Sequence, residues 1–309
     1  MRLPRVPEAF GQLGGWSGWR SLGLDTRRLG NAVPMVFPWE NHGVLERLRS
    51  GPDGLMRAEA LSVRAGQVET AGQSAARGPH REGSDDVSPI IWDGPEPVDL
   101  EAVEAIPGMP GEYLALASRG IVYRLKVTGS TAEVVDYTPL PGIGEGDDFE
   151  SFALVAQNGK LAALWADRGA GAARPATLNA SRLSFAPWGQ PQFGAVTRRS
   201  YVAVYPTGEG TRHISDISVT GSGRIIVSSA ADAGDDGPFD SAVSDAGRVT
   251  VSATGRVQVR LAAIPTVLGT FPRFKIEAVE CLPGSSDTLL GTDDENLGGY
   301  VRTMPFCGA

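Results

Sequence analysis

The stretch DLEAVEAIPGMPGEYLALASRGIVYRL, residues 99–125, decides the fold. It reads as an apolar strand that carries an acid, a Pro-Gly turn, a second strand YLALA, the triplet Ser-Arg-Gly and a third strand. Alternation of apolar and polar residues, as in VYRLKV at 122–127, is typical of a strand with one buried face. The stretch therefore predicts antiparallel strands that are joined by tight turns.

The acid-containing strand recurs along the chain. Its copies read AEAL at 58–61, LEAV at 100–103, FESF at 149–152, SDIS at 215–218 and IEAV at 276–279. The spacing between them lies around the length of a four-stranded propeller blade, about 40–50 residues before loop insertions. We expect an all-β propeller of five blades, with inner strands near residues 58–63, 100–105, 149–155, 215–220 and 276–282. A four-bladed ring and a β-sandwich are the alternatives.

The segments outside the repeat complete this scheme. Residues 1–50 are read as an N-terminal extension with a short helical candidate at Gly43–Ser50, and residues 51–309 as the propeller. An unpaired outer edge invites aggregation, so the ring has to close. We expect VSPIIW at 87–92 to be the outer strand of the first blade and residues before Leu55 to complete the last. In the four-bladed alternative, VSPIIW closes the ring.

Composition excludes several classes of function. The net charge of −8 lacks the basic footprint of a nucleic-acid-binding protein. No apolar window is long enough for a membrane span, and the N-terminus lacks the apolar core of a signal peptide. We expect a soluble, cytoplasmic monomer. Secretion is the alternative if the start codon is misassigned. Cys281 and Cys307 are expected to be reduced thiols, with one disulfide bridge as the alternative.

Equivalent positions of a cyclic repeat meet at the axis, which locates a candidate site. The repeated acids are expected to converge at the channel, where like charges must be neutralised by a cation, by arginine or by proton uptake. They are Glu59, Glu101, Glu150, Asp216 and Glu277. Arg119 and Arg168 follow their acids at the same offset. We expect these two arginines to neutralise the ring of acids, or to hold an anionic substrate.

The sequence offers oxygen donors for a metal but few nitrogen or sulfur donors, which favours calcium. The candidate ligands are Asp216, Asp293 and Asp294, with further acids in the loops Asp232–Asp236 and Asp293–Asn296. Ordinary polar turns, and acids bonded to backbone N–H groups, are the alternatives. The glycine-rich GIGEG at 142–146 precedes a strand rather than a helix, so no nucleotide cofactor is expected.

Residues 99–125 and KIEAVECLPGSSDTLLGTDDENLGG at 275–299 resemble blades of bacterial phytase-like and SdiA-regulated β-propellers. The resemblance covers residues 57–304 unevenly. It implies a channel that often holds calcium, with phosphoester or ester hydrolysis in some relatives. It carries over to Glu101, Glu150, Glu277, Asp293 and Asp294. Insertions in the third and fourth units, and the lack of dense acid clusters, depart from true phytases.

Three functions follow as hypotheses. The first is an enzyme that hydrolyses an ester or phosphoester of a small anionic molecule, with metal assistance. Glu150 and Glu277 are its candidate bases, and Arg119, Arg168 and Glu101 its candidate substrate ligands. His213, the histidine inside the repeat pattern, is a further candidate base, with a hydrogen-bonded surface residue as the alternative. The second hypothesis is a non-catalytic binding scaffold with a structural metal, and the third is a glycoside-active propeller.

Overall fold

The computed structural model describes residues 90–308 apart from residues 232, 235–236, 283 and 295–298, and four strands before residue 90. All described elements are β-strands, which confirms the all-β class. Among these residues, no helix is long and apolar enough to cross a membrane.

Four sheets contain the repeat, and each is named here by its first full-length strand. In chain order they are the β6, β10, β15 and β19 blades. The β6 blade holds β5 (Ile91–Asp93), β6 (Leu100–Ala105), β7 (Glu112–Ala117), β8 (Ile121–Thr128) and β9 (Thr131–Pro139). The β10 blade holds β10 (Phe149–Gln157), β11 (Lys160–Asp167), β12 (Ala176–Phe185), β13 (Pro191–Phe193) and β14 (Thr197–Tyr201).

The other two blades are four-stranded. The β15 blade holds β15 (Thr211–Val219), β16 (Arg224–Ala231), β17 (Asp240–Val251) and β18 (Val257–Pro272). The β19 blade holds β19 (Ile276–Cys281), β20 (Thr288–Thr292), β21 (Gly299–Met304) and β1 (Gly11–Leu13).

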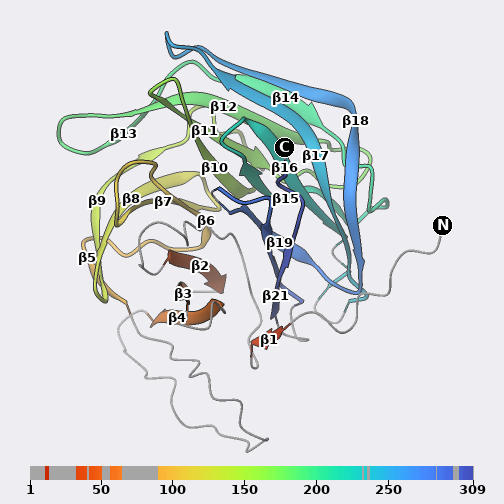
Figure 1. Cartoon of the computed structure of the whole chain (residues 1–309), viewed down its shortest axis with the longest axis horizontal. Helices are drawn as coiled ribbons and strands as arrows, with labels where there is room; N and C mark the ends of the chain where they lie inside the picture. Colours follow the sequence, from red (N-terminus) through yellow and green to blue (C-terminus); the bar gives the residue numbers. More distant parts are fainter. Residues whose placement is uncertain are drawn as a thin grey trace, which may run out of the picture.

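The first strands of the four blades face one another. β6 contacts β10, β10 contacts β15, and β15 contacts β19, whereas β9, β13 and β18 lie at the periphery (Figure 1). This radial arrangement of antiparallel sheets is that of a β-propeller. The inner strands predicted near 100–105, 149–155, 215–220 and 276–282 are therefore confirmed.

A further three-stranded sheet precedes the four blades. It consists of β2 (Val33–Trp39), β3 (His42–Ser50) and β4 (Met56–Arg64), in that order. β2 contacts β6, so the inner strand predicted at 58–63 is wrong, because those residues lie in β4 at the opposite end of the sheet. The helical candidate at Gly43–Ser50 is also wrong, since β3 forms its backbone hydrogen bonds with β2 and β4. The division of the chain at residue 50 stays a prediction.

The structure confirms the prediction about the last blade and contradicts the prediction about VSPIIW. β1 pairs antiparallel with β21, which confirms that residues before Leu55 complete the last blade. The prediction that VSPIIW at 87–92 forms the outer strand of the first blade is wrong for residues 90–92, the part of this segment that the structure describes. β5 pairs in parallel with β9 of the β6 blade, and the preceding Ile90 is buried in the core of that blade.

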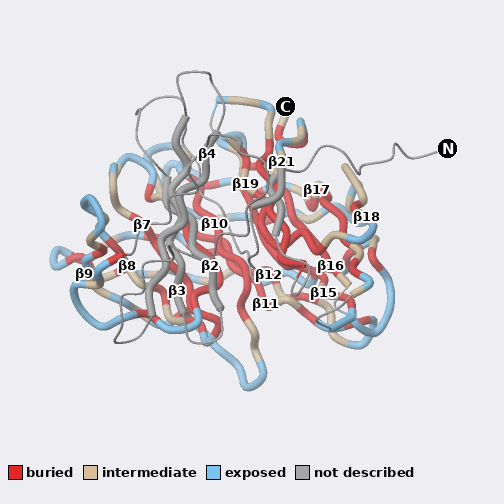
Figure 2. Tube along the Cα trace, turned by 90° about the horizontal axis from the view of Figure 1, so that it is seen from below, coloured by how far each residue is buried: buried red, intermediate tan, exposed pale blue. Residues whose placement is uncertain are grey.

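The core lies between neighbouring blades rather than in one central cluster. One cluster joins the β6 and β10 blades around Phe152 and Trp165, a second joins the β10 and β15 blades, and a third joins the β15 and β19 blades. Figure 2 shows the buried residues concentrated along the central strands and the exposed ones in the connecting turns. Each inner strand is thus buried on both sides, which leaves its acids to face the channel.

A disulfide joins Cys281, at the end of β19, to Cys307 near the C-terminus, with Cα atoms 5.5 Å apart. The expectation of two reduced thiols is therefore wrong. The backbone N–H of Cys307 donates to the carbonyl of Ser286, which holds the C-terminal segment beside the turn between β19 and β20. This contact brings together two sulfur atoms that the sequence gives no reason to pair.

Candidate functional site at the channel mouth

The repeated acids of three inner strands share a local backbone feature. The strand register shifts between Leu100 and Ala102, between Phe149 and Ser151, and between Ile276 and Ala278. Glu101, Glu150 and Glu277 therefore each occupy a β-bulge, a feature that re-aims a side chain. The recurring motif thus marks an inner strand that bends at its acid.

Asp216 does not occupy the equivalent position. In β15 the register shift lies between Arg212 and Asp216, and Asp216 is already paired with Ser228. Its Oδ2 accepts a hydrogen bond of 2.8 Å from the backbone N–H of Val279 in the next blade. The fourth copy of the motif therefore places its acid deeper in the channel than the other copies do.

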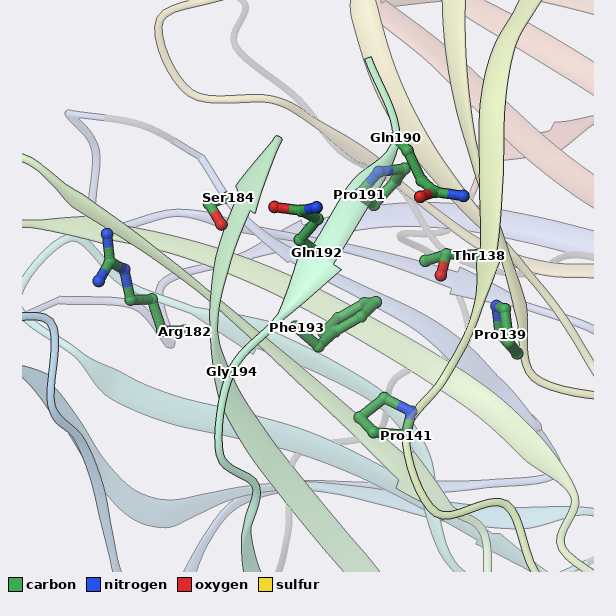
Figure 3. A pocket seen from close by; sticks show the side chains of 10 residues that line it. All are labelled: Thr138, Pro139, Pro141, Arg182, Ser184, Gln190, Pro191, Gln192, Phe193 and Gly194. Atoms are coloured by element: carbon green, nitrogen blue, oxygen red, sulfur yellow. The ribbon is translucent and has the colours of Figure 1, made fainter. Parts of the chain in front are cut away.

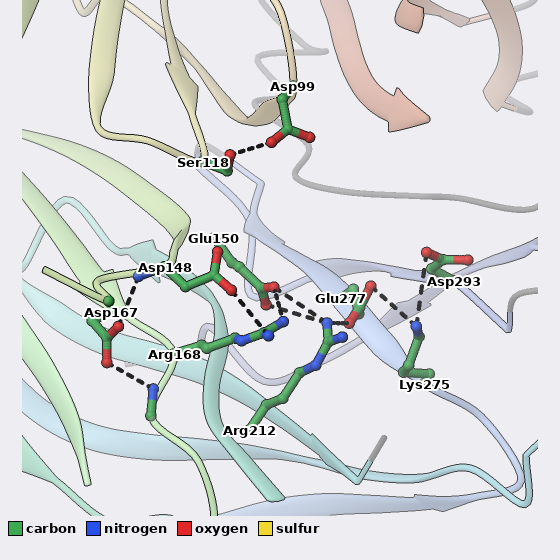
Figure 4. A network of polar contacts seen from close by, with 12 residues as sticks. Asp99, Ser118, Asp148, Glu150, Asp167, Arg168, Arg212, Lys275, Glu277 and Asp293 are labelled. Carbon is green, nitrogen blue, oxygen red and sulfur yellow. Dashed lines mark hydrogen bonds and ion pairs between the residues drawn. The ribbon is translucent and has the colours of Figure 1, made fainter. Parts of the chain in front are cut away.

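Two glutamates from different blades share one guanidinium group. Arg212 Nη1 donates to Glu277 Oε1 at 2.7 Å and lies 3.3 Å from Glu150 Oε1 (Figure 4). Arg168 Nη1 donates to the same Glu150 oxygen at 2.7 Å. The carboxylate of Glu150 is thus held between two guanidinium groups, one from its own blade and one from the next.

The network continues into the β19 blade through a buried lysine. Lys275 Nζ lies 3.7 Å from Glu277 Oε2 and 3.9 Å from Asp293 Oδ2. The side chains of Lys275 and Glu277 are 0% and 1% exposed. Charges buried this deeply cost several kcal/mol per ion unless they are paired. We call the set Asp148, Glu150, Arg168, Arg212, Lys275, Glu277 and Asp293 the mouth network.

Exposure within the mouth network rises toward Arg168. The Arg168 side chain is 29% exposed, and its Nη2 lies 2.9 Å from Oδ2 of Asp148, which is 34% exposed. Arg212 is 12% exposed and Glu150 is 3% exposed. Arg168 and Asp148 are thus the exposed end of the network, and Arg168 is its most exposed cation.

Arg212 and Lys275 are functional candidates that the sequence interpretation missed. Lys275 stands two residues before Glu277, as Asp148 stands two residues before Glu150. That recurring position next to the acid was a usable signal. Arg212 had no such signal, because the register shift in β15 displaces it from the alignment of the repeats.

Arg119 does not join the network. The backbone N–H of Arg168 donates to the carbonyl of Asp148, and in the β6 blade it is Ser118 that donates to Asp99. Ser118 is therefore the structural equivalent of Arg168, and Arg119 lies one residue further, exposed in the turn between β7 and β8. The prediction that Arg119 meets Arg168 at the ring of acids is wrong, because the β6–β7 hairpin is one residue shorter between the two positions.

His213 is buried beside the network with both ring nitrogens bonded to backbone. Its Nδ1 accepts from the N–H of Ala203 at 3.2 Å, so Nε2 carries the proton and donates to the carbonyl of Gly171 at 2.7 Å. This arrangement leaves no lone pair for a general base, and it corrects the placement of His213 at the surface.

A second group of acids lies further along the inner strands. Glu104, Asp216 and Glu280 come from three blades, and we call them the inner carboxylates. Burial, then repulsion by Glu280 and by Asp216, raises the pKa of Glu104 well above its usual value, and the N–H of Leu154 offsets this in part. Glu101, the remaining predicted residue, is buried in its bulge at the start of β6.

Two of the predicted calcium ligands, Asp293 and Asp294, lie beside hydrogen-bond and ion-pair partners of the protein itself. Asp294 accepts from the N–H of Lys275 at 2.6 Å and from the hydroxyl of Thr292 at 2.8 Å, while Asp293 faces the Lys275 ammonium. Within the described residues, no group of three or more His, Cys, Asp or Glu could hold a metal ion. The Lys275 ammonium thus lies beside one of the predicted calcium ligands, and calcium binding stays a prediction. The side chain of Glu59, residues 295–296 and all three acids of Asp232–Asp236 lie outside the described residues.

Fold and site together define a β-propeller with a network of ion pairs across three of its blades. No family model matches this chain, and neither does a curated protein. Among solved structures it is similar to the GH43 protein BlXynB from Bacillus licheniformis, solved as a mutant, at 14% identity and a TM-score of 0.39. The match covers 81% of this chain and 47% of that one, so the chain spans about half the length of that protein. The resemblance to phytase-like and SdiA-regulated propellers is not confirmed.

Proposed function

We propose that the channel mouth binds a small anionic molecule and hydrolyses an ester or phosphoester bond in it. The observation that carries this proposal is the position of Glu150 between the guanidinium groups of Arg168 and Arg212. A fixed carboxylate can take a proton from an attacking water, and fixed guanidinium groups stabilise charge that develops on oxygen. A candidate base therefore lies beside candidate electrophilic groups.

Arg168 is the residue that would receive the substrate. It is the more exposed of the two arginines, and it contacts Asp148 at the open side of the network. An arriving carboxylate or phosphate would replace Asp148 and bind the guanidinium bidentately. Glu277 and Lys275, which are fully buried, would hold Arg212 in place rather than touch the substrate.

We further propose that the sheet of β2, β3 and β4 is the fifth blade. Its strands follow one another in antiparallel order, as in the other blades, and its first strand contacts β6. A fifth sheet at this place would continue the ring beside the β6 blade (Figure 1). Truncation of residues 1–64 is expected to abolish cooperative unfolding.

The test is an assay of the full chain against anionic and neutral nitrophenyl esters and phosphoesters. Glu150→Gln is expected to lower kcat/KM at least about 100-fold, the usual contribution of a general base. Arg168→Gln is expected to raise KM for the anionic substrates alone. Arg119→Gln is the matched control, because Arg119 is exposed and outside the network, and its kinetics should equal those of the parent chain.

A non-catalytic binding scaffold is the second candidate. It is favoured by the ion pairs of Glu150 and Glu277, since a fully paired network also serves to join blades. Saturable binding of an anion without turnover, weakened by Arg168→Gln, would select the scaffold. Turnover that Glu150→Gln leaves unchanged would remove the enzymatic proposal for this site.

A further inference from the structure

The outer strands of the β10 and β15 blades carry arginines without acids. Residues 176–201, from β12 to β14, contain three arginines and no acid. Residues 246–272, which hold the end of β17 and all of β18, contain another three arginines and no acid. The two segments are neighbours, because β12 and β14 contact β18 at the periphery of the molecule (Figure 1). In a chain with a net charge of −8, this flank is a local excess of positive charge.

One face of the β17–β18 hairpin collects three of these arginines. Its residues alternate with valines of both strands, of which Val249, Val251 and Val259 are buried in the core between the β10 and β15 blades. The residues of the opposite face are all exposed, and we call them the arginine face. They are Arg248, Thr250 and Ser252 before the turn, and Arg256, Gln258 and Arg260 after it.

The arrangement of these arginines is unfavourable for the fold by itself. Arg248 and Arg260 are directly opposite each other, which places their Cβ atoms about 5 Å apart, and like charges at such positions are destabilising. The acid that precedes them, Asp245, already binds Arg224 at 2.6 Å. Arg248 donates only to the carbonyl of Ser222, and neither arginine forms an ion pair with a described residue. Two guanidinium groups are thus held together without a counter-charge, as recognition of an anion requires.

Two further arginines raise the positive potential around the arginine face. Arg199 Nε donates to the carbonyl of Val259 at 3.2 Å, at the outer edge of β18. Arg182, at one end of the cavity drawn in Figure 3, packs against Gly255 in the turn between β17 and β18. Neither belongs to the face. Both contact the hairpin, so their charges lie within the Debye length of about 8 Å at physiological ionic strength.

We propose that the arginine face binds an acidic polysaccharide, a linear chain of sugars that carry carboxylates. Arg256 and Arg260 lie on one strand, about 14 Å apart at the usual rise per residue. One small anion cannot span this distance, whereas carboxylates spaced along a polymer can. Gln258 lies between the two arginines, opposite Thr250. Both side chains donate and accept hydrogen bonds, which suits the hydroxyl groups of sugars.

The arginine face lacks the groups that other anionic partners use. It carries no aromatic side chain on which a nucleic-acid base could stack. It carries no apolar side chain that could enter a bilayer or anchor a protein. Polyphosphate would engage the arginines but would offer no donor to Thr250 and Gln258. The surface is separate from the mouth network and does not depend on the function proposed for it.

The experiment measures binding of the full chain to polygalacturonate, with neutral dextran, monomeric galacturonate, polyphosphate, single-stranded DNA and anionic phospholipid vesicles for comparison. We expect saturable binding of polygalacturonate that added salt weakens, and no binding of dextran or of the monomer. Joint substitution of Arg248→Gln, Arg256→Gln and Arg260→Gln should weaken it about tenfold, as the loss of three exposed charge contacts predicts. Thr250→Val with Gln258→Ala should weaken polygalacturonate binding and leave polyphosphate binding unchanged.

Three exposed cations elsewhere provide the matched control. Joint substitution of Arg119→Gln, Lys126→Gln and Arg273→Gln removes the same charge and should leave the affinity unchanged, as should Arg168→Gln at the mouth. Arg260→Gln should not lower the melting temperature, since it relieves a repulsive pair. Equal losses of affinity for the two triple variants would overturn the proposal. Absence of polygalacturonate binding, or tighter binding of polyphosphate, DNA or vesicles, would overturn it as well.

Discussion

The mouth network and the inner carboxylates both place acids on the inner strands of the blades, and they stabilise them by different means. At the mouth, Glu150 and Glu277 contact Arg168, Arg212 and Lys275. Among the inner carboxylates, burial and repulsion by Glu280 and Asp216 raise the pKa of Glu104, which favours its protonated form. The difference shows that the repeat brings acids together but does not set their charge state. The cations that lie beside each acid determine whether its charged form is stabilised.

The largest effect is expected when the guanidinium group that Glu150 and Glu277 share is removed. Arg212→Met should lower the free energy of unfolding by about 4–5 kcal/mol, because it leaves two buried carboxylates without that partner. Urea denaturation at pH 7 measures the loss. Arg119→Met is the matched control, and a loss within about 0.5 kcal/mol is expected for this exposed residue. Equal losses for the two variants would contradict the network.

A second pair of substitutions should act in opposite directions. Glu150→Gln is expected to cost about 3 kcal/mol, since two guanidinium groups lose a charged acceptor. Glu104→Gln should instead stabilise the fold by about 1 kcal/mol at pH 8, because it removes a charge whose burial is unfavourable. Thermal melts of the two variants at pH 8 measure both effects. A destabilised Glu104→Gln variant would show that Glu104 carries its charge usefully.

The titration of Asp294 should make the stability of the protein depend on pH. Burial raises its pKa from 3.8 to about 6, against hydrogen bonds from Lys275 and Thr292. The folded state then binds the proton more tightly than the unfolded state does. The contribution of Asp294 to the free energy of unfolding is therefore complete below about pH 4 and is lost as the pH rises through 6. The loss should be about 2 kcal/mol, and Asp294→Asn should remove it. Denaturation curves from pH 4 to 7 test this, and a flat parent profile would contradict the shift.

The smallest effect is expected from calcium. Lys275 and the two arginines already pair with the acids of the mouth, so EDTA and added calcium should each leave the melting temperature unchanged. A rise of several degrees with calcium would show that the ion binds the folded state. The acids of Asp232–Asp236, which all lie outside the described residues, would then be the next candidate ligands.

The sequence predicted the four inner strands because each carries the same acid between small or apolar neighbours. It failed at the first copy, since AEAL at 58–61 matches the motif by composition but lies in β4. A motif of four residues does not distinguish the inner strand of a blade from another strand, because an acid between small and apolar residues suits both.

Within the site, the sequence predicted that arginine neutralises the acids, and Arg168 does so. It misplaced Arg119 because equal offsets along the chain do not guarantee equal register when hairpin lengths differ. It missed Arg212 because a register shift in β15 moves this residue beside Glu150 and Glu277. Register is fixed by pairing between strands, which a single sequence shows only indirectly.

The pairing of β1 with β21 has a consequence for how the chain folds. The β19 blade is built from residues at both ends of the chain, Gly11–Leu13 and Ile276–Met304. This blade cannot be completed before β21 has been synthesised, and its closure pairs residues as far apart in the sequence as Gly11 and Val301. Contacts of such separation slow folding. The last step of folding should therefore be the docking of β1. Until then, one edge of β21 in a refolding chain should remain unpaired.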